Sequence, residues 1–216
     1  MNAIFQFLIG IDRSVFKAIN SLAGKSSVLD WFARLGADDH VIPIVLVLLV
    51  LLLVLLARNR QAREAAFTCI ICTLLAVIIS MAILFILNGA FFRPRPFTSI
   101  PTAHLLFYHN TDSALPSNAA TLTFVLAFSV FLYNRKVGAA MLALAVYVGV
   151  ARIMCGIHYP LDIISGALLG LGSASLARAA EPLFRPLARA VNSASDRLLA
   201  SWMRAPRVQP RGGGST

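Results

Sequence analysis

The stretch that decides the class of fold is Ala65–Leu87, AAFTCIICTLLAVIISMAILFIL, an apolar run without a charged residue. A run of this length is enough for one α-helix to cross the hydrocarbon core of a membrane. The run VIPIVLVLLVLLLVLLA at Val41–Ala57 precedes it, and three further runs begin near Ala119, Val137 and Leu161. The sequence therefore predicts about five transmembrane helices.

Composition and length agree with this prediction. The chain has 216 residues, of which 58% are hydrophobic, and its mean hydropathy is +0.79. A soluble fold of this size could not bury so much apolar surface. We therefore expect an all-α, polytopic membrane helix bundle that forms one domain over residues 1–204, followed by a disordered tail at 205–216.

Two amphipathic segments flank the predicted spans. Before the spans, apolar residues recur at helical spacing: Ile4, Leu8, Ile11, Val15, Ile19 and Leu22. This pattern predicts a helix that lies in the membrane interface, and a short extra span is the alternative. After the spans, basic and apolar residues are interleaved in Glu181–Arg204, as expected of a helix that rests on anionic headgroups.

The net charge of +10 is distributed over the loops rather than gathered on one soluble module, which argues against a nucleic-acid-binding protein. The basic residues gather at one end of the predicted bundle: Arg58, Arg60, Arg63, Arg135, Lys136, Arg178, Arg185, Arg189 and Arg197. By the positive-inside rule this end is cytoplasmic. The loops Asn88–Pro116 and Gly156–Tyr159 must then share the opposite, outer membrane face.

Small residues inside the spans are expected to serve packing. Cys69 and Cys72 lie one turn apart in an apolar helix, whereas a redox pair would need a polar, accessible helix start. Gly166, Gly170 and Gly172 allow close approach of helices. Packing within the bundle is the favoured use of these glycines, and dimerisation remains the alternative.

Three ionisable residues stand at the outer edge of the last two predicted spans, namely Arg152, His158 and Asp162. Ionisable residues at such a depth are functional candidates. Because His158 and Asp162 are four residues apart, the carboxylate can reach the imidazole from the same face if a helix begins near His158. Such a contact fixes the tautomer and leaves the other ring nitrogen free to attack. A structural pair that caps the helix is the alternative.

Two further clusters lie on the same expected face. Arg93 and Arg95, in RPRPF, can bind phosphate oxygens, although arginines that extend to the headgroups beside helix-stopping prolines would look the same. Pro116 and Ser117 open the third predicted span with free backbone N–H groups, which suits either an anion site or an ordinary N-cap. Arg152 on the same face favours a phosphate site, since three arginines can surround one phosphoryl group.

In this order the three stretches resemble the type 2 phosphatidic acid phosphatase superfamily, whose pattern is K-x6-RP, then PSGH, then SR-x5-H-x3-D. The spacing of the third motif is reproduced by Arg152, His158 and Asp162. Arg95-Pro96 and Pro116-Ser117 match the other two motifs. Within the superfamily, RPRPF and the five-span layout are most similar to bacterial undecaprenyl-diphosphate phosphatases.

The resemblance implies a role for each matched residue. His158 would be the nucleophile that forms a phosphohistidine, and Asp162 would orient it. Arg95 and Arg152 would clamp the phosphate, and Ser117 with its neighbouring backbone amides would bind further oxygens. The family uses neither a metal nor a cofactor.

Four positions depart from the family pattern. Asn88 replaces the lysine of the first motif, and Arg93 is the candidate that would supply the missing charge. Ala151 replaces a serine, and Asn118 replaces a glycine in the phosphate-binding motif. Ala119 stands where the family has a histidine that protonates the leaving oxygen, and alanine cannot transfer a proton.

The sequence offers two explanations of Ala119. Either His104 or His109 of the same loop supplies the proton, or Ala119 is an engineered replacement of a natural histidine, which we favour. General acid catalysis contributes about 10²–10⁴-fold. Because a phosphate monoester leaves far more easily than an alkoxide, residual activity should be greater on lipid diphosphates than on monophosphates.

The sequence therefore predicts a hydrolase for undecaprenyl diphosphate that recycles the carrier for peptidoglycan synthesis. It would be a multi-pass protein of the bacterial inner membrane, with its site facing the periplasm or cell exterior and with membrane lipids as its surroundings. The same mechanism acting on phosphatidylglycerophosphate, phosphatidate or lipid A is the second hypothesis, and a non-catalytic lipid-binding or lipid-translocating protein is the third. We interpret Asp38, Asp39 and His40 as a solvated turn rather than a metal site.

Overall fold

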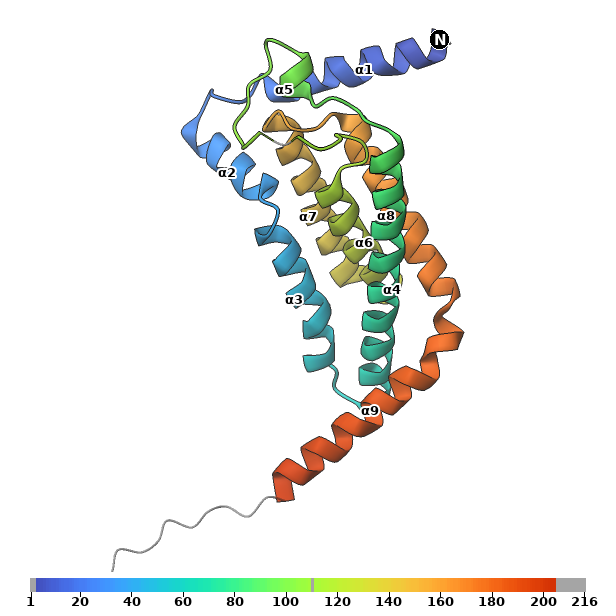
Figure 1. Ribbon diagram of the computed structural model, residues 1–216. Coiled ribbons are helices and arrows are strands. Elements are labelled where there is room, and N and C mark those ends of the chain that lie inside the picture. The colour runs from blue at the N-terminus through green and yellow to red at the C-terminus, as the bar shows by residue number, and fades with distance from the viewer. Residues whose placement is uncertain (1–2, 110, 205–216) are drawn as a thin grey trace, which may run out of the picture.

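A computed structural model describes residues 3–109 and 111–204, and the regular structure over these residues is entirely helical. The helices are α1 (Ala3–Asn20), α2 (Ser27–Ala37), α3 (Val41–Leu55), α4 (Arg60–Ala90), α5 (Pro96–Ser99), α6 (Asn118–Phe131), α7 (Arg135–Met154), α8 (Pro160–Ala179) and α9 (Glu181–Arg204). Figure 1 shows an upright bundle with α1 and α9 at its two ends. The tail predicted at residues 205–216 lies outside the described residues.

All five predicted spans are helices, namely α3, α4, α6, α7 and α8. By length and composition α4, α7 and α8 can each cross a membrane, whereas α2 and α3 pass the same test only together, with a bend of 56° between them. α6 is apolar but has only 14 residues. The chain is thus a multi-pass helical membrane bundle in which α6 is a short inner helix. α2 was not predicted from the sequence.

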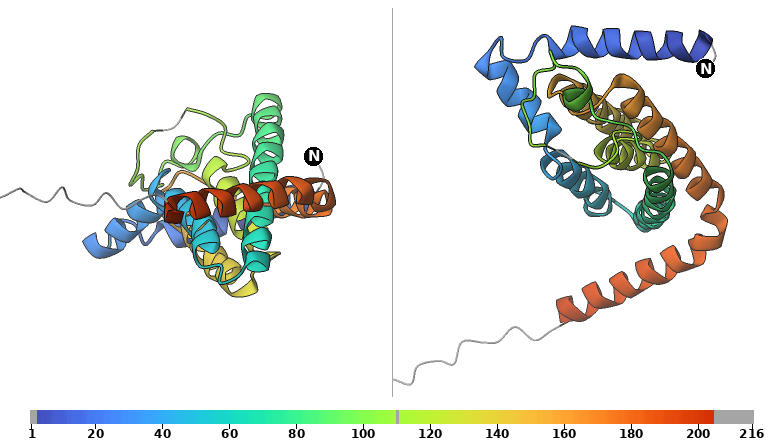
Figure 2. Two further views of the ribbon diagram at one scale, coloured as in Figure 1. Left: turned by 90° about the horizontal axis from the view of Figure 1, so that it is seen from below. Right: turned by 45° about the horizontal axis from the view of Figure 1, so that its top comes forward.

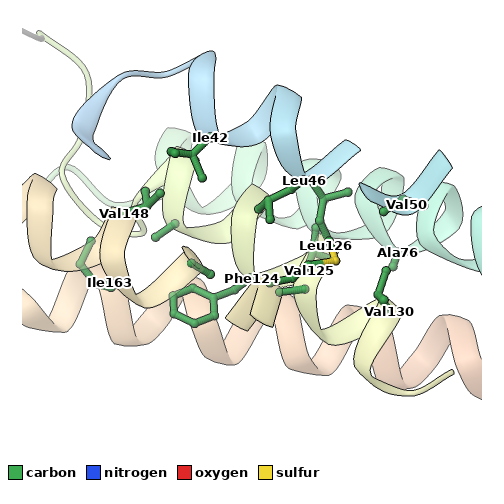
Figure 3. Close-up of a cluster of buried hydrophobic side chains, with 14 of the residues drawn as sticks. Ile42, Leu46, Val50, Ala76, Phe124, Val125, Leu126, Val130, Val148 and Ile163 are labelled. Atoms are coloured by element: carbon green, nitrogen blue, oxygen red, sulfur yellow. The ribbon is translucent and has the colours of Figure 1, made fainter. Parts of the chain in front are cut away.

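The core of the bundle surrounds α6, which contacts α3, α4, α7 and α8. Figure 3 shows the buried side chains that meet there, among them Ile42, Leu46, Val50, Ala76, Phe124, Val125, Leu126, Val130, Val148 and Ile163. Cys69 and Cys72 belong to the same core as free thiols, which confirms the prediction that they are packing residues. Because α6 packs against four other helices, their contacts stabilise it although it is short.

Glycines on α8 allow it to approach α6 closely. A Cβ atom at Gly170 would lie 2.8 Å from the backbone nitrogen of Val125, and one at Gly166 would lie 3.0 Å from that of Thr121. A larger side chain at Gly170 would therefore push the two helices apart. Gly172 faces open space. The prediction of packing within the bundle is confirmed for Gly166 and Gly170.

α1 lies across one end of the bundle (Figure 1; Figure 2, right). It buries Asp12, Phe16 and Asn20 against the other helices. The apolar residues whose spacing predicted this helix are instead exposed: Leu8, Ile11, Val15 and Leu22. An exposed apolar stripe on a helix outside the bundle is what contact with lipid in the membrane interface requires.

α9 crosses the opposite end and is tied to the start of α4. Nε of Arg63 donates to Oδ1 of Asn192 at 2.7 Å, and Arg63 also pairs with Asp196. Nε of Arg189 donates to Oε1 of Glu64 at 3.0 Å. These polar contacts hold the amphipathic helix against the end of the bundle where the sequence concentrates its basic residues.

Candidate active site

The two loops that were predicted to share one membrane face meet at the α1 end of the bundle. The backbone nitrogen of Leu106 donates to the carbonyl of Cys155 at 3.1 Å. The backbone nitrogen of Ser117 donates to the carbonyl of Asp162 at 3.1 Å. Segments far apart in the sequence are thus joined directly, and the prediction that they lie together is confirmed.

A tight turn between α7 and α8 presents His158. Gly156 has φ +82°, and a Cβ atom there would lie 2.3 Å from the carbonyl oxygen of His104, so only glycine fits. Nδ2 of Asn20 donates to that same oxygen at 2.8 Å and to the carbonyl of Met154 at 2.9 Å. α1 therefore helps to fix the turn.

His158 is almost fully buried, with 1% of its surface exposed. Its Nδ1 lies 3.0 Å from the carbonyl oxygen of Ala114, which only accepts, so Nδ1 carries the proton and Nε2 keeps its lone pair. Nη1 of Arg95 lies 3.2 Å and Nη2 of Arg152 lies 3.4 Å from Nε2. Burial, and then the charges of Arg152 and Arg95, lower the pKa of His158 well below its usual value. The imidazole is therefore neutral, as a nucleophile must be.

Asp162 lies beside His158, but its hydrogen bonds go to other groups. Its Oδ2 is 3.5 Å from Nδ1 of His158 and accepts a hydrogen bond from the backbone nitrogen of Tyr159 at 2.7 Å. Its Oδ1 accepts from Nη1 of Arg93 at 2.5 Å. The predicted carboxylate–imidazole contact is thus an electrostatic one, because the proton on Nδ1 is donated to Ala114.

Arg95 and Arg152 are both buried, and each is oriented by a carboxylate. Nη2 of Arg95 donates to Oδ1 of Asp112 at 2.7 Å. Nη1 of Arg152 donates to Oδ1 of Asp39 at 2.7 Å and to the carbonyl of Ala37 at 2.8 Å. Nε of Arg152 is buried and has no partner among the described residues. A buried donor of this kind is suited to an oxygen of a bound anion.

These groups surround a cavity of about 250 Å³. The cavity is lined by Asp39, Met81, Arg95, Asp112, Asn118, Ala119, Leu122, Arg152 and His158. Asn118 is the first residue of α6, so the positive end of that helix borders the same space. Ala119 forms part of the wall, which leaves an apolar methyl group where the family pattern has a proton donor. The cavity combines a neutral imidazole with two guanidinium groups, which suits phosphoryl chemistry.

The structure does not bring Arg93 to this cavity. Its guanidinium bridges Asp162 and Asp12, and it lies 4.3 Å above the ring of Tyr159. In the structure Arg93 therefore does not stand in for the missing lysine at this cavity, because it pairs with two carboxylates outside it.

Asn88 and Ser117 also stand outside the cavity lining. Nδ2 of Asn88 donates to Oδ1 of Asn118 at 3.0 Å, so Asn88 supports a residue of the cavity wall. Oγ of Ser117 accepts from the backbone nitrogen of Ala120 at 3.5 Å, which is the ordinary N-cap that the sequence left as an alternative.

Neither candidate for a replacement acid lines the cavity. His104 contributes its carbonyl to the turn before His158, and its side chain is not part of the cavity wall. The ring of His109 packs edge-on against Phe97, with the ring centroids 5.0 Å apart. The geometry therefore offers no support for proton donation by these two histidines.

The segment at residues 38–40 is the turn before α3, with the side chain of His40 82% exposed as predicted, but Asp39 departs from a purely solvated turn. Oδ1 of Asp38 accepts from the backbone nitrogens of His40 and Val41, at 2.8 and 2.9 Å, and so begins α3. Asp39 turns inward to Arg152 and lines the cavity. No group of three possible metal ligands comes together within residues 3–109 and 111–204. Asp39 is a site residue that sequence reasoning missed, because only the bend between α2 and α3 brings it there.

Comparisons with known proteins agree with this geometry. The PAP2 superfamily, the type 2 phosphatidic acid phosphatases, matches residues 69–184, which is more than half of the chain and includes every matched motif. The chain belongs to the PAP2 superfamily. The resemblance drawn from the three motifs is therefore confirmed.

Two relatives of the chain carry informative names. The chain is 44% identical over 80 residues to the bacitracin transport permease protein BcrC of Bacillus licheniformis. These 80 residues cover 37% of this chain and only 39% of that relative. It is 27% identical over 161 residues to the undecaprenyl-diphosphatase BcrC of Bacillus subtilis (strain 168), covering 74% of this chain and 79% of the relative.

Two solved PAP2-type structures share the fold. The crystal structure of Aquifex aeolicus LpxE has a TM-score of 0.60 at 24% identity, covering 78% of this chain and 95% of that one. A phosphatidylglycerolphosphate phosphatase of Bacillus subtilis has a TM-score of 0.56 at 18% identity, covering 81% and 86% of the two chains. At these identities the likeness concerns the fold alone.

Proposed function

We propose that this protein is a lipid phosphate phosphatase in which Nε2 of His158 attacks phosphorus. The observation that carries the proposal is the convergence of Arg95 and Arg152 on the unprotonated Nε2, at 3.2 and 3.4 Å, beside the 250 Å³ cavity. Two fixed cations next to a neutral nucleophile hold a phosphoryl group where attack can occur. They also stabilise the charge that develops on its oxygens.

The first chemical step joins Nε2 of His158 to the terminal phosphorus. The phosphorus–oxygen bond to the rest of the lipid breaks, and its electron pair leaves with the oxygen. The imidazole ring gains positive charge, which the carboxylate of Asp162 stabilises from 3.5 Å while Ala114 holds the Nδ1 proton. In the second step water attacks phosphorus, the phosphorus–nitrogen bond breaks, and the water's protons remain with the released phosphate and solvent.

Undecaprenyl diphosphate is the substrate that we favour. Its leaving group is a phosphate monoester with a second pKa of about 6, which can depart without the proton donor that Ala119 lacks. One of the relatives, from Bacillus subtilis, is named undecaprenyl-diphosphatase. The reaction would recycle the carrier for peptidoglycan synthesis at the outer face of the bacterial inner membrane, in keeping with the basic residues at the α9 end.

The proposal is tested by phosphate release from the purified, detergent-solubilised protein. Undecaprenyl diphosphate, phosphatidylglycerophosphate, phosphatidate and a lipid A phosphate are compared, with and without His158→Ala, in the present chain and in Ala119→His. We expect release that depends on His158 and is fastest on the diphosphate. A faster rate on one of the monophosphates would assign that lipid instead.

A non-catalytic lipid-binding or lipid-translocating protein is the second candidate, and Ala119 is the observation that favours it. The same assay separates the two. Absence of His158-dependent release from every lipid, even after Ala119→His, would favour binding alone and overturn the catalytic proposal.

A further inference from the structure

Asp12 is the unusual residue of α1. Its side chain is fully buried, although its neighbours Ile11 and Arg13 on the same helix are exposed. A buried carboxylate is strongly unfavourable unless charges and hydrogen bonds compensate it. The partners of Asp12 should therefore show what keeps it buried.

Both oxygens of Asp12 are engaged close to the catalytic histidine. Oδ1 accepts a hydrogen bond from the backbone nitrogen of Leu161 at 2.8 Å. This N–H belongs to the first turn of α8, which has no partner within its own helix. Oδ2 accepts from Nη2 of Arg93. Asp12 thus ties α1 both to the start of α8 and to Arg93.

Arg93 stands between two carboxylates and continues the contact toward His158. Its Nη1 donates to Oδ1 of Asp162, while Oδ2 of Asp162 faces Nδ1 of His158 at 3.5 Å. Tyr159 fixes the plane of the guanidinium by lying under it at 4.3 Å. Asp12, Arg93, Asp162 and the imidazole therefore form one continuous chain of contacts.

The backbone of Arg93 supports the second partner of the imidazole. Its carbonyl accepts from the backbone nitrogen of Ala114 at 2.9 Å, and the carbonyl of Ala114 is the acceptor for Nδ1 of His158. This backbone contact survives a change of the Arg93 side chain. A substitution there consequently tests the contact with Asp162 without removing the acceptor of Nδ1.

The charges in this chain of contacts also matter. One positive guanidinium is shared by two carboxylates, so the group as a whole keeps a net negative charge beside the imidazole. Loss of the Asp12 charge would let Arg93 neutralise Asp162 more fully. The carboxylate would then stabilise the positive ring of the phosphohistidine less well.

We propose that Asp12 and Arg93 are positioning residues of this active site. They act through Asp162, hold its carboxylate toward Nδ1 of His158, and so connect a helix placed at the membrane interface to the nucleophile. Arg93 does not bind the substrate phosphate in this arrangement. The inference rests on the proposed function, since it assigns a role within the phosphatase reaction.

The test uses steady-state kinetics of the whole protein with undecaprenyl diphosphate, in the present chain and in Ala119→His. Arg93→Gln, Arg93→Lys and Asp12→Asn are compared, with Arg13→Gln as the matched control on the exposed side of α1. We expect Arg93→Gln to lower kcat by about 10- to 100-fold, the effect of a small misplacement of a reacting group. KM should change by less than about twofold, because substrate contacts stay in place.

The conservative variants sharpen the expected result. Arg93→Lys should recover part of the kcat, because lysine keeps the charge but cannot bridge both carboxylates in one plane. Asp12→Asn should lower kcat less than Arg93→Gln, since asparagine can still accept from Leu161. Arg13→Gln should leave both constants unchanged.

Other outcomes would overturn the inference. A rise in KM with unchanged kcat would make Arg93 a substrate-binding residue. A lower melting temperature with unchanged kcat in the folded fraction would make its role purely structural. If release depends on His158 but is unaffected by Arg93 and Asp12, the inference alone fails. If no variant shows release that depends on His158, the proposed function fails and the inference with it.

Discussion

The two ends of the bundle both hold many charged residues, but they hold them differently. At the α1 end, Arg95, Arg152, His158 and Asp162 are at most 4% exposed. At the α9 end, the side chains of Arg189 and Glu64 are 64% and 34% exposed. Buried charges interact strongly and cannot lose one partner cheaply, whereas exposed pairs are screened by solvent. The same residue types therefore serve attachment of α9 at one end and, in the proposed reaction, chemistry at the other.

The largest effect should come from Ala119→His, which places an imidazole on the cavity wall. On a lipid monophosphate such as phosphatidate, a restored general acid should raise kcat by about 10²–10⁴-fold. The gain on undecaprenyl diphosphate should be smaller, because its leaving oxygen needs less protonation. Parallel kcat measurements on the two lipids check this, and an equal gain on both would refute it.

A matched pair of arginine substitutions tests the contrast between the two ends directly. Arg152→Gln removes a buried cation next to Nε2 of His158 and leaves Asp39 without its ion-pair partner, although Asp39 keeps its hydrogen bond from Tyr108. It should lower kcat/KM by about 10²–10³-fold, the usual loss for one fixed donor at a reacting group. Arg60→Gln, at an exposed pair with Asp196, should leave kcat/KM unchanged. Similar losses of kcat/KM for the two variants would mean that burial of an arginine does not determine its effect on the reaction.

The lowered pKa of His158 makes stability depend on pH at the α1 end. Below the usual value of 6.5 the unfolded chain binds a proton at this residue, while the folded protein keeps the imidazole neutral. The free energy of unfolding should therefore fall as pH falls from 6.5 toward the pKa of the folded state, and His158 should contribute nothing above that range. Thermal denaturation from about pH 7.5 to about pH 5 should show a weaker decline for His158→Gln than for the parent chain. Identical pH profiles would contradict the lowered pKa.

The smallest effect is expected at the α9 end. Arg189→Gln removes an exposed pair with Glu64 and should change the free energy of unfolding by less than about 1 kcal/mol. The melting temperature in detergent, measured at low and high salt, checks this. A large fall in melting temperature that does not depend on salt would contradict this, because it would show that the bilayer or the rest of α9 buries the pair.

The sequence predicted most of the helices but only part of the site. Hydrophobic runs located α3, α4, α6, α7 and α8, because burial in lipid or in the core imposes a local pattern. α2 was not predicted, because it passes the test for a membrane span only together with α3, from which it is separated by a bend. The spacing of Arg152, His158 and Asp162 identified the PAP2 superfamily before any contact was known. The sequence also predicted that Arg93 binds the phosphate, whereas in the structure its guanidinium pairs with Asp12 and Asp162.

The sequence by itself determined the membrane bundle, the amphipathic terminal helices and the motif that bears His158, since each depends on residues close together along the chain. Tertiary structure decided which carboxylate meets which arginine. Asp39 reaches Arg152 across 113 residues, and Asp12 reaches Leu161 across 149. Such pairs leave no periodic or spacing signal, because they depend on how helices cross. Packing therefore selects, from many possible partners, the ones that keep the buried charges compensated.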